Sequence, residues 1–409
     1  MNPAVSIIVT TYNRGPLLRR QLHHLSLQDL PHDRFEVIVS DDGSSDGTAE
    51  IVESFVGRLP LQYHVQEDLG FRASTARNAG ARLASAPVLV FLDAGAMPGP
   101  GLARAHLAAH EDPAAHRMVI GHGHGFGANL ARLAGLAEAM DEAPLDEVAR
   151  RFAGNPEFRD GREDRLAAAG YDLGRDPLPW QLFFTFNCSV RADDFRRIGG
   201  FDEAFVQWGA EDIEIAFRGA RHGLTFGYAP DAWIVEWPHE RPMGDRMATF
   251  TENMLQFLAK FPEPVIEVGW RAVRDVEFWS WPQFAREISE HTARVREVDV
   301  RAEIAQAAAA HGDGSLVVIG AGGDLPDLPA GTVVVEFDRQ LLDRAGGDGR
   351  HAVGIRTTLA DQSVETVLIT SRLAGLWEHW GADLLAEAGR IGRKTELTDR
   401  LAALIEARR

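Results

Sequence analysis

Two adjacent carboxylates, Glu211 and Asp212, are the strongest sign of chemistry in this 409-residue sequence. They precede apolar residues at helical spacing, so they are predicted to stand at the N-terminus of a helix. Acidic residues there also have a simpler role, because they complement the positive end of the helix dipole. The preceding residues, Trp208 and Gly209, favour chemistry, since they would build a concave, partly apolar edge beside the carboxylates. A general base held at such an edge would face a substrate hydroxyl.

Further polar side chains follow three short apolar runs that are predicted to be strands. The runs are Val5–Thr10, Phe35–Ser40 and Val88–Leu92, and the polar segments after them are Thr11–Arg14, Asp41–Ser44 and Asp93. Helical stretches separate the strands, and this alternation predicts right-handed crossovers and a mostly parallel α/β sheet. Ligands of such sheets bind outside the carboxyl ends of the strands. One polar segment alone is an ordinary turn, whereas three at equivalent positions indicate a binding site.

Composition limits the class of protein. Apolar residues make up 45% of the chain and charged residues 25%, which is ordinary for a globular protein. The formal net charge of -18 argues against general affinity for nucleic acid. One cysteine, Cys188, excludes an internal disulfide framework. There is no recognisable signal peptide, and no run approaches the roughly 20 apolar residues of a membrane helix. We therefore expect a soluble, cytoplasmic protein.

The length predicts more than one domain, and changes in composition suggest where the boundaries lie. We expect an α/β catalytic domain over residues 1–245, a helical connecting region over 246–311 and a small α/β domain over 312–409. Within the first domain, Leu130–Ala169 is charged and alanine-rich and is predicted to be an inserted lid or cover. His122 and His124 stand among glycines without a nearby carboxylate or cysteine, which favours a mobile loop over a metal site.

The last domain contains Gly320-Ala321-Gly322-Gly323 after one predicted strand and Asp338 after the next. This arrangement is similar to the start of a dinucleotide or S-adenosylmethionine site. The third glycine of the spacing Gly-x-Gly-x-x-Gly is absent, however, and the segment is short for a methyltransferase domain. We therefore expect a structural appendage that serves dimerisation or acceptor docking.

The first ~245 residues resemble the family 2 glycosyltransferases, whose catalytic domain has the GT-A fold, a Rossmann-like α/β architecture. The segments that carry the resemblance are Val5–Arg14, Val37–Thr48 and Ala76–Gly80, in the order and spacing of the family. A later part resembles the galactosyltransferase-type second half of chondroitin polymerase-like and β-1,4-galactosyltransferase-like enzymes. Its segments are Phe186–Arg191, Ile198–Asp202 and Trp208–Asp212.

The resemblance implies an enzyme that transfers a sugar, with inversion, from a UDP, GDP or dTDP donor to an acceptor. Asp212 matches the general base, with Glu211 beside it, and Trp208 and Asn187 match the sugar and acceptor pocket. Carboxylates in the donor pocket can accept from the N–H of a base, and the fork of an arginine suits phosphate. The matching donor-binding positions are Thr11, Tyr12, Arg14, Asp42, Arg72, Arg77 and Asp93.

The chain departs from the family at Gly95, where the Asp-x-Asp motif that begins at Asp93 has its second aspartate. That second carboxylate usually binds the divalent cation that bridges the diphosphate. Two expectations remain open. Either Asp93, His239 and phosphate oxygens hold Mg²⁺ or Mn²⁺, or arginines and backbone donors neutralise the leaving group without a metal.

The leading hypothesis is an inverting glycosyltransferase that acts on a soluble acceptor, such as a small natural product, a peptide or a saccharide. One alternative is a nucleotidyltransferase that makes an activated sugar, although the N-terminal region lacks a glycine-rich, lysine-containing phosphate loop. Another is a degenerate, non-enzymatic protein that binds a nucleotide sugar. The substitution at Gly95 favours this last reading, whereas the intact Glu211-Asp212 pair opposes it. A homodimer is an open expectation.

Overall fold

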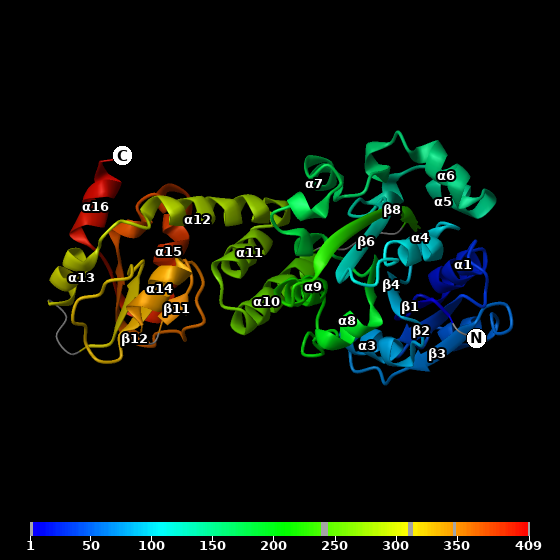
Figure 1. Cartoon of the computed structure of the whole chain (residues 1–409), viewed down its shortest axis with the longest axis horizontal. Coiled ribbons are helices and arrows are strands. Elements are labelled where there is room, and N and C mark those ends of the chain that lie inside the picture. The colour runs from blue at the N-terminus through cyan, green and yellow to red at the C-terminus, as the bar shows by residue number, and fades with distance from the viewer. Residues whose placement is uncertain (1–2, 239–243, 310–313, 347–348, 408–409) are drawn as a thin grey trace. The chain divides into compact units, whose positions relative to one another are not determined.

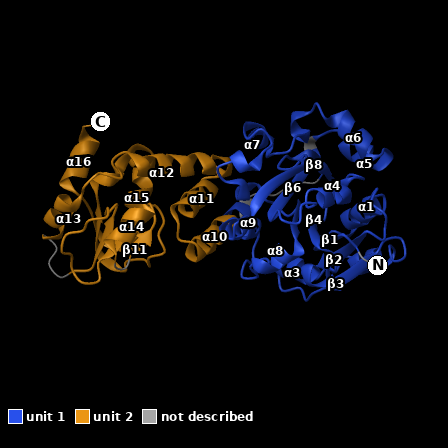
Figure 2. Cartoon of the chain, in the orientation of Figure 1, with its two compact units in different colours: residues 1–249 blue, residues 250–409 orange. Residues whose placement is uncertain are grey.

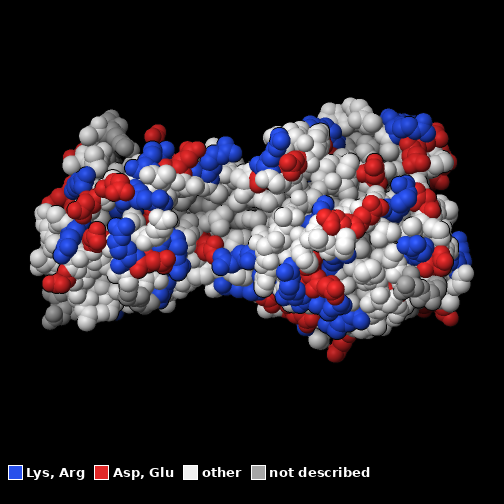
Figure 3. Space-filling model, in the orientation of Figure 1, with Lys and Arg blue, Asp and Glu red and all other residues white. Residues whose placement is uncertain are grey.

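The computed structural model describes residues 3–238, 244–309, 314–346 and 349–407 (Figure 1). The chain divides into two compact units, residues 1–249 and 250–409 (Figure 2). The described part of the segment predicted to be a helical connection, residues 246–309, is mainly helical, and most of it belongs to the second unit. No helix among the described residues is long and apolar enough to cross a membrane. On the face shown in Figure 3, acidic and basic side chains are interspersed over both units.

The first unit is built on one eight-stranded sheet, whose strand order is β3-β2-β1-β4-β7-β6-β8-β5. The strands are β1 (Val5–Thr11), β2 (Phe35–Asp41), β3 (Leu61–Val65), β4 (Val88–Asp93), β5 (Ala96–Pro98), β6 (Arg117–His124), β7 (Asn187–Arg191) and β8 (Thr225–Glu236). The first four in spatial order are parallel, which confirms the predicted α/β architecture. β7 is antiparallel to both of its neighbours, so β6 and β8 again run with β4.

Helices connect these strands and cover the sheet. They are α1 (Gly15–Ser26), α2 (Thr48–Glu53), α3 (Ala73–Leu83), α4 (Leu102–Ala108), α5 (Leu136–Glu142), α6 (Leu145–Phe152), α7 (Glu163–Ala168), α8 (Ala192–Arg197), α9 (Glu211–Arg221) and α10 (Gly244–Lys260), which crosses into the second unit. Short 3₁₀ turns lie at Leu130–Arg132, Pro156–Phe158, Leu173–Arg175 and Pro179–Leu182. Strands β1, β2 and β4 are almost wholly buried because their runs of β-branched residues face helices on both sides.

The second unit holds a parallel five-stranded sheet, ordered β11-β10-β9-β12-β13. Its strands are β9 (Leu316–Ile319), β10 (Val333–Glu336), β11 (Gly349–His351), β12 (Val364–Ile369) and β13 (Gly392–Leu397). Its helices are α11 (Pro264–Arg274), α12 (Trp281–Val295), α13 (Arg301–Ala308), α14 (Arg339–Ala345), α15 (Trp377–Ile391) and α16 (Asp399–Glu406), with 3₁₀ turns at Phe278–Ser280 and Ser371–Leu373. This order is that of a doubly wound sheet, in which a nucleotide would lie beyond the first strand.

In this second unit, the carboxylate at the end of β10 is already hydrogen-bonded to other groups of the protein. Glu336, at the end of β10, is fully buried and accepts from the backbone N–H of Gly322 at 2.8 Å. It also accepts from the backbone N–H of Asp338 at 2.9 Å and from the guanidinium of Arg372 at 3.0 Å. The backbone of the glycine turn is thus hydrogen-bonded to a carboxylate that is itself paired with an arginine, and the structural role expected for this unit stays a prediction.

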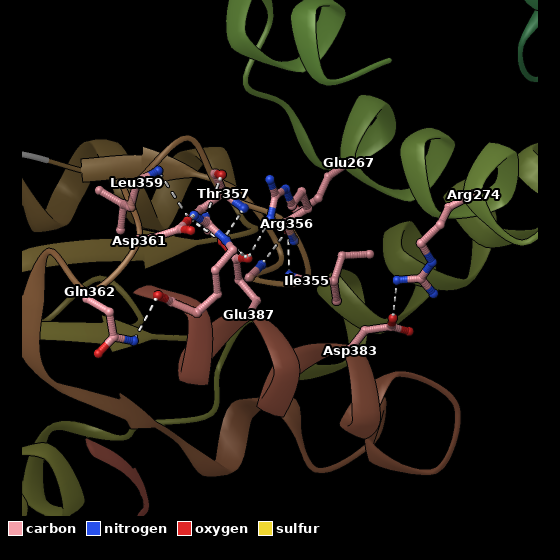
Figure 4. Close-up of polar contacts among 12 residues, drawn as sticks. Glu267, Arg274, Ile355, Arg356, Thr357, Leu359, Asp361, Gln362, Asp383 and Glu387 are labelled. Carbon is pink, nitrogen blue, oxygen red and sulfur yellow. Dashed lines mark hydrogen bonds and ion pairs between the residues drawn. The ribbon is translucent and has the colours of Figure 1, made fainter. Parts of the chain in front are cut away.

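A second buried carboxylate, Glu267 on α11, holds the loop between β11 and β12. It accepts backbone N–H groups from Val353, Gly354, Ile355 and Arg356 at 2.6 to 2.9 Å (Figure 4). Four donors wrap one carboxylate, so the loop has its backbone N–H groups paired without a strand partner. α11 is thereby joined to the sheet of its own unit.

We predict that Glu267→Gln lowers the unfolding free energy of the second unit by about 3 kcal/mol or more, because the amide turns an N–H toward backbone donors that then lose an acceptor. Differential scanning calorimetry would resolve the transition of this unit. Glu290→Gln, at an exposed position on α12, should shift that transition by less than about 0.5 kcal/mol. Equal shifts for the two variants would contradict the role given to Glu267.

Candidate functional site

The polar segments predicted from the sequence do meet at one edge of the first sheet. Thr10 of β1 lies opposite Asp93 of β4, and Thr11 lies opposite Asp41 of β2. The loops beyond β1 and β2 are also tied together, because the backbone N–H of Asn13 donates to the hydroxyl of Ser44 at 2.7 Å. Parallel strands therefore bring together residues that lie up to about ninety positions apart in the chain.

The predicted nucleoside side of this edge centres on Asp42, which is buried. Its carboxylate accepts from the side-chain amide of Gln66 at 2.5 Å and from the backbone N–H of Arg72 at 2.7 Å. Burial raises the pKa of Asp42, and these hydrogen bonds oppose the rise. Tyr12 stands at the opening with 44% of its surface exposed, and its hydroxyl donates to Asp68 at 3.0 Å. Thr11 is buried beneath them.

Arg77 on α3 is the centre of the site. Its side chain is 5% exposed, and its guanidinium lies 3.0 Å from a carboxylate oxygen of Asp93. The same group lies 3.4 Å from Glu211 and 3.4 Å from Asp212. Three carboxylates, one from β4 and two adjacent ones from the start of α9, therefore share one buried cation.

These charges fix the protonation of Arg77. Burial alone would lower its pKa, but the charges of Asp93, Asp212 and Glu211 raise the pKa above its ordinary value. With all four groups ionised, the cluster carries a net charge of about -2. Arg77 was predicted to be a donor-binding residue, which stays a prediction, and the structure shows its guanidinium paired with three acids of the protein.

Asp212 is held in place by Thr185 as well as by Arg77. The backbone N–H of Thr185 donates to one carboxylate oxygen at 3.1 Å, and its hydroxyl lies 3.1 Å from both oxygens. The Asp212 side chain keeps 17% of its surface exposed, so it can still meet a substrate. The pKa of Asp212 is raised to about 7. Burial is the largest cause, the charge of Arg77 opposes the rise, and the charge of Glu211 adds to it.

Glu211 is more deeply buried than Asp212, and both of its carboxylate oxygens face groups of the protein. One carboxylate oxygen accepts from the backbone N–H of Gly209 at 2.9 Å, and the other faces Arg77. Gly209 has a φ of +104° and Ala210 one of +70°, so the turn before α9 is strained. Burial raises the pKa of Glu211. The geometry makes Glu211 a positioning residue that stabilises this turn and orients the guanidinium.

The two predicted pocket residues lie in different surroundings. Trp208 is half-buried at the same turn, and the guanidinium of Arg246 on α10 lies 5.6 Å from its ring. Asn187 is fully buried at the start of β7, where its side chain donates to the carbonyls of Ala232 and His122. Its oxygen lies 2.8 Å from a ring nitrogen of His106. Asn187 therefore links strands β6, β7 and β8 by buried hydrogen bonds.

A resident metal ion is not supported by the residues that the structure describes. No group of three or more histidine, cysteine, aspartate or glutamate side chains among them is arranged to hold a cation. Asp93 is 42% exposed, but one of its oxygens faces Arg77. Gly95 has a φ of +110°, a conformation that an aspartate would adopt only with strain. His239, the other predicted ligand, lies outside the described residues.

The two glycine-flanked histidines are not in a loop, as the sequence favoured, but at the end of β6. His122 contacts the hydroxyl of Tyr228 at 2.8 Å and a ring nitrogen of His124 at 3.3 Å. The pKa of His124 is lowered to about 4, mainly by burial and in addition by the charge of His122, so this ring is neutral. β6 lies two strands from β4, so the pair stands about 10 Å from the Asp93 end of the sheet.

Two residues of this site were missed from the sequence. Thr185 is the one polar residue in the run from Phe183 to Phe186, and that isolation was an available signal. Arg246 carried no signal in the sequence, because its partner Trp208 lies far before it in the chain.

Known proteins resemble this chain over both units. Residues 6–126 match the model of "Glycosyl transferase family 2", and residues 167–240 match that of "N-terminal domain of galactosyltransferase". A protein of Streptomyces hygroscopicus subsp. limoneus named validoxylamine A glucosyltransferase is 37% identical over 403 residues, which cover 95% of this chain and 89% of the relative. The protein of that name from S. hygroscopicus subsp. jinggangensis (strain 5008) is also 37% identical, with 95% of each chain covered.

Among solved structures, the mannosyltransferase PcManGT from Pyrobaculum calidifontis, in complex with GDP-Man and Mn²⁺, superposes with a TM-score of 0.45. It is 22% identical in sequence, and the match covers 76% of this chain and 81% of that chain.

We predict that Arg77→Met destabilises the first unit by about 3–5 kcal/mol at pH 8, because three carboxylates lose their shared cation. The folded-state pKa values of Glu211 and Asp212 are already raised above their unfolded values in the wild type, and they rise further when this cation is lost. Stability then falls as pH rises through that interval, so the loss should be clearly smaller at pH 5. Thermal unfolding at both pH values measures the difference.

Arg82→Met is the matched control, since Arg82 is an exposed arginine on the same helix whose nearest acid, Glu203, is 3.8 Å away. Its effect should stay below about 0.5 kcal/mol at either pH. An Arg77→Met deficit that is the same at pH 5 and pH 8 would contradict the electrostatic account of the cluster.

Proposed function

We propose a specific reaction for this chain, which belongs to glycosyl transferase family 2 and is a glycosyltransferase. The resemblance predicted from the sequence motifs, and with it the GT-A fold class, is thereby confirmed. The proposed reaction is the inverting transfer of a sugar from a nucleoside diphosphate donor to a soluble acceptor, with Asp212 as general base. The observation that carries it is a partly exposed carboxylate, held by Thr185 and Arg77, at the edge where the predicted donor loops meet.

In the proposed step, the acceptor hydroxyl gives its proton to Asp212 as its oxygen attacks the anomeric carbon. A bond forms between that oxygen and carbon, and the bond from the carbon to the diphosphate oxygen breaks. The electron pair of the broken bond leaves with the nucleoside diphosphate. Attack from the face opposite the leaving group inverts the anomeric centre, and a positioned base contributes about 10²–10⁴-fold.

The donor would lie over the carboxyl ends of β1, β2 and β4. Asp42 and Tyr12 would contact the nucleoside, and Arg14 and Arg72 would lie near the phosphates. The expected requirement for Mg²⁺ or Mn²⁺ stays a prediction, and the described residues supply no complete site for either ion. Assays with each ion, and with EDTA, test it directly.

The names of the relatives suggest which substrates to try first. We propose that the transferred sugar is a glucosyl group and that the acceptor is a small soluble molecule, with validoxylamine A as the first candidate. The two relatives of that name cover nearly the whole chain, second unit included. His124, a neutral ring at the end of β6, would donate a hydrogen bond to an acceptor hydroxyl.

The test is an assay of purified protein with UDP-, GDP- and dTDP-glucose and validoxylamine A, read by mass spectrometry for the product and by NMR for the anomeric configuration. A product with inverted configuration is expected. A retained configuration would refute the mechanism, and the absence of transfer with every donor would refute the proposed substrates.

We predict that Asp212→Asn lowers kcat by about 10²–10⁴-fold while donor affinity changes little, since the amide keeps the shape but accepts no proton. Calorimetric titration with the donor nucleotide separates the two effects. Asp193→Asn, at a highly exposed position on α8, should leave both quantities unchanged. Near-normal turnover by Asp212→Asn would rule out Asp212 as the base.

We also predict an acid limb in the pH dependence of kcat/KM, with an apparent pKa near 7. The base must be ionised to accept a proton, so activity falls about tenfold per pH unit below that value. Glu211 titrates in the same cluster, so the limb belongs to the coupled pair. A flat profile between pH 5.5 and 8 would contradict a base with a raised pKa.

A further inference from the structure

Two arginines near the donor end of the site have no acidic partner. Among the described residues, neither Arg14 nor Arg246 makes an ion pair with a carboxylate. Several other half-buried or buried arginines of the first unit do so, as with Arg162 and Asp160 at 2.7 Å or Arg218 and Glu214 at 2.7 Å. In a chain with a net charge of -18, two neighbouring cations without acids are unexpected.

Arg246 is joined to the catalytic turn by two contacts. Its guanidinium lies 5.6 Å from the ring of Trp208, four residues before the predicted base. The hydroxyl of Thr249, one turn further along α10, lies 3.2 Å from the carbonyl oxygen of Trp208 and 2.9 Å from that of Arg246. The first turns of α10 are therefore fixed against the turn that carries Asp212.

Arg14 approaches the same place from the other side. It precedes α1, three residues beyond the end of β1, and β1 is the hydrogen-bonded neighbour of β4 at Asp93. Burial lowers the pKa of Arg246, and the charge of Arg14 lowers it further, so the two guanidinium groups lie within each other's field. Like charges held together repel, and an anion between them would relieve that repulsion.

We propose that Arg14 and Arg246 form a two-guanidinium clamp for the diphosphate of the donor and neutralise the charge that develops on the leaving group. This inference rests on the proposed function, because a nucleoside diphosphate is the leaving group of that reaction. It adds Arg246, on a different helix from every predicted donor residue, to the catalytic machinery. It also gives Arg14, so far placed only near the phosphates, a partner on a second helix.

Two features of the site favour a role for these two arginines in binding the diphosphate. Gly95 supplies no carboxylate for a bridging cation, and Arg77 is already shared by three acids. Arg14 and Arg246 are not shared with acids in this way, so their charge is available to the departing diphosphate. The planar fork of an arginine can make two parallel hydrogen bonds to phosphate oxygens, and such charge-assisted bonds are strong where water is excluded.

Stacking of Arg246 on Trp208 does not by itself explain why Arg14 lies near Arg246. An arginine over a tryptophan face gains about 0.5–1 kcal/mol at a partly exposed position, which would account for Arg246 but not for the nearby Arg14.

The test measures binding and not only transfer. UDP, GDP and dTDP are titrated against the wild-type protein by calorimetry to find the base that binds, and its nucleoside without phosphates is then titrated as well. In Arg246→Gln and in Arg14→Gln, affinity for the diphosphate should fall at least tenfold, whereas affinity for the nucleoside should change less than twofold. Arg246→Lys should restore part of the loss.

Arg19→Gln is the control, since it removes the same charge from an exposed position on α1 and should change neither affinity. Thermal unfolding verifies that each variant is folded. If wild-type protein binds none of the three diphosphates, the proposed function itself fails. If wild-type protein binds one and both glutamine variants bind it equally well, or lose the nucleoside to the same degree, the clamp is refuted while the proposed function stands.

Discussion

The ion cluster around Arg77 is the constraint on which the active-site edge depends. One guanidinium on α3 faces Asp93 at the end of β4 and the Glu211-Asp212 pair at the start of α9. Because the four side chains come from three separate elements, α3, β4 and α9, the cluster fixes where α9 begins relative to the sheet. A buried cation also lets two adjacent acids remain close together, which neither could do alone in a medium of low dielectric. The position of Asp212, the proposed base, is thus a consequence of charge pairing.

That arrangement separates the two neighbouring acids into different roles. Glu211 is held on one oxygen by the turn before α9 and on the other by Arg77, so it cannot approach a substrate. Asp212 faces Thr185 and remains partly exposed. Side by side in the sequence, the two look equivalent. The difference in their surroundings arises because successive residues at a helix start point in directions about 100° apart.

Much of the fold was predictable from the sequence, and less of the site. The strands are runs of β-branched residues between turn-forming ones, so their existence and parallel order follow from pattern alone. The helix start at Glu211 was predictable for the same reason. Thr185 and Arg246 were missed because their partners, Asp212 and Trp208, lie 27 and 38 positions away, where no local pattern reports contact. Arg77 was assigned to phosphate because residue type does not reveal which acids the fold places beside it.

The glycine at position 95 links the fold to the chemistry of the leaving group. It turns the chain between β4 and β5 with a φ of +110°, and its carbonyl accepts from the backbone N–H of Trp237 at 2.9 Å. A side chain there would meet only Leu17, at an ordinary 3.5 Å, so backbone conformation and not space disfavours an aspartate. The second carboxylate of the family motif is therefore incompatible with this turn as it stands. Residue 95 therefore offers the diphosphate no carboxylate-bound cation, and the proposed pair of arginines without acidic partners would supply positive charge there.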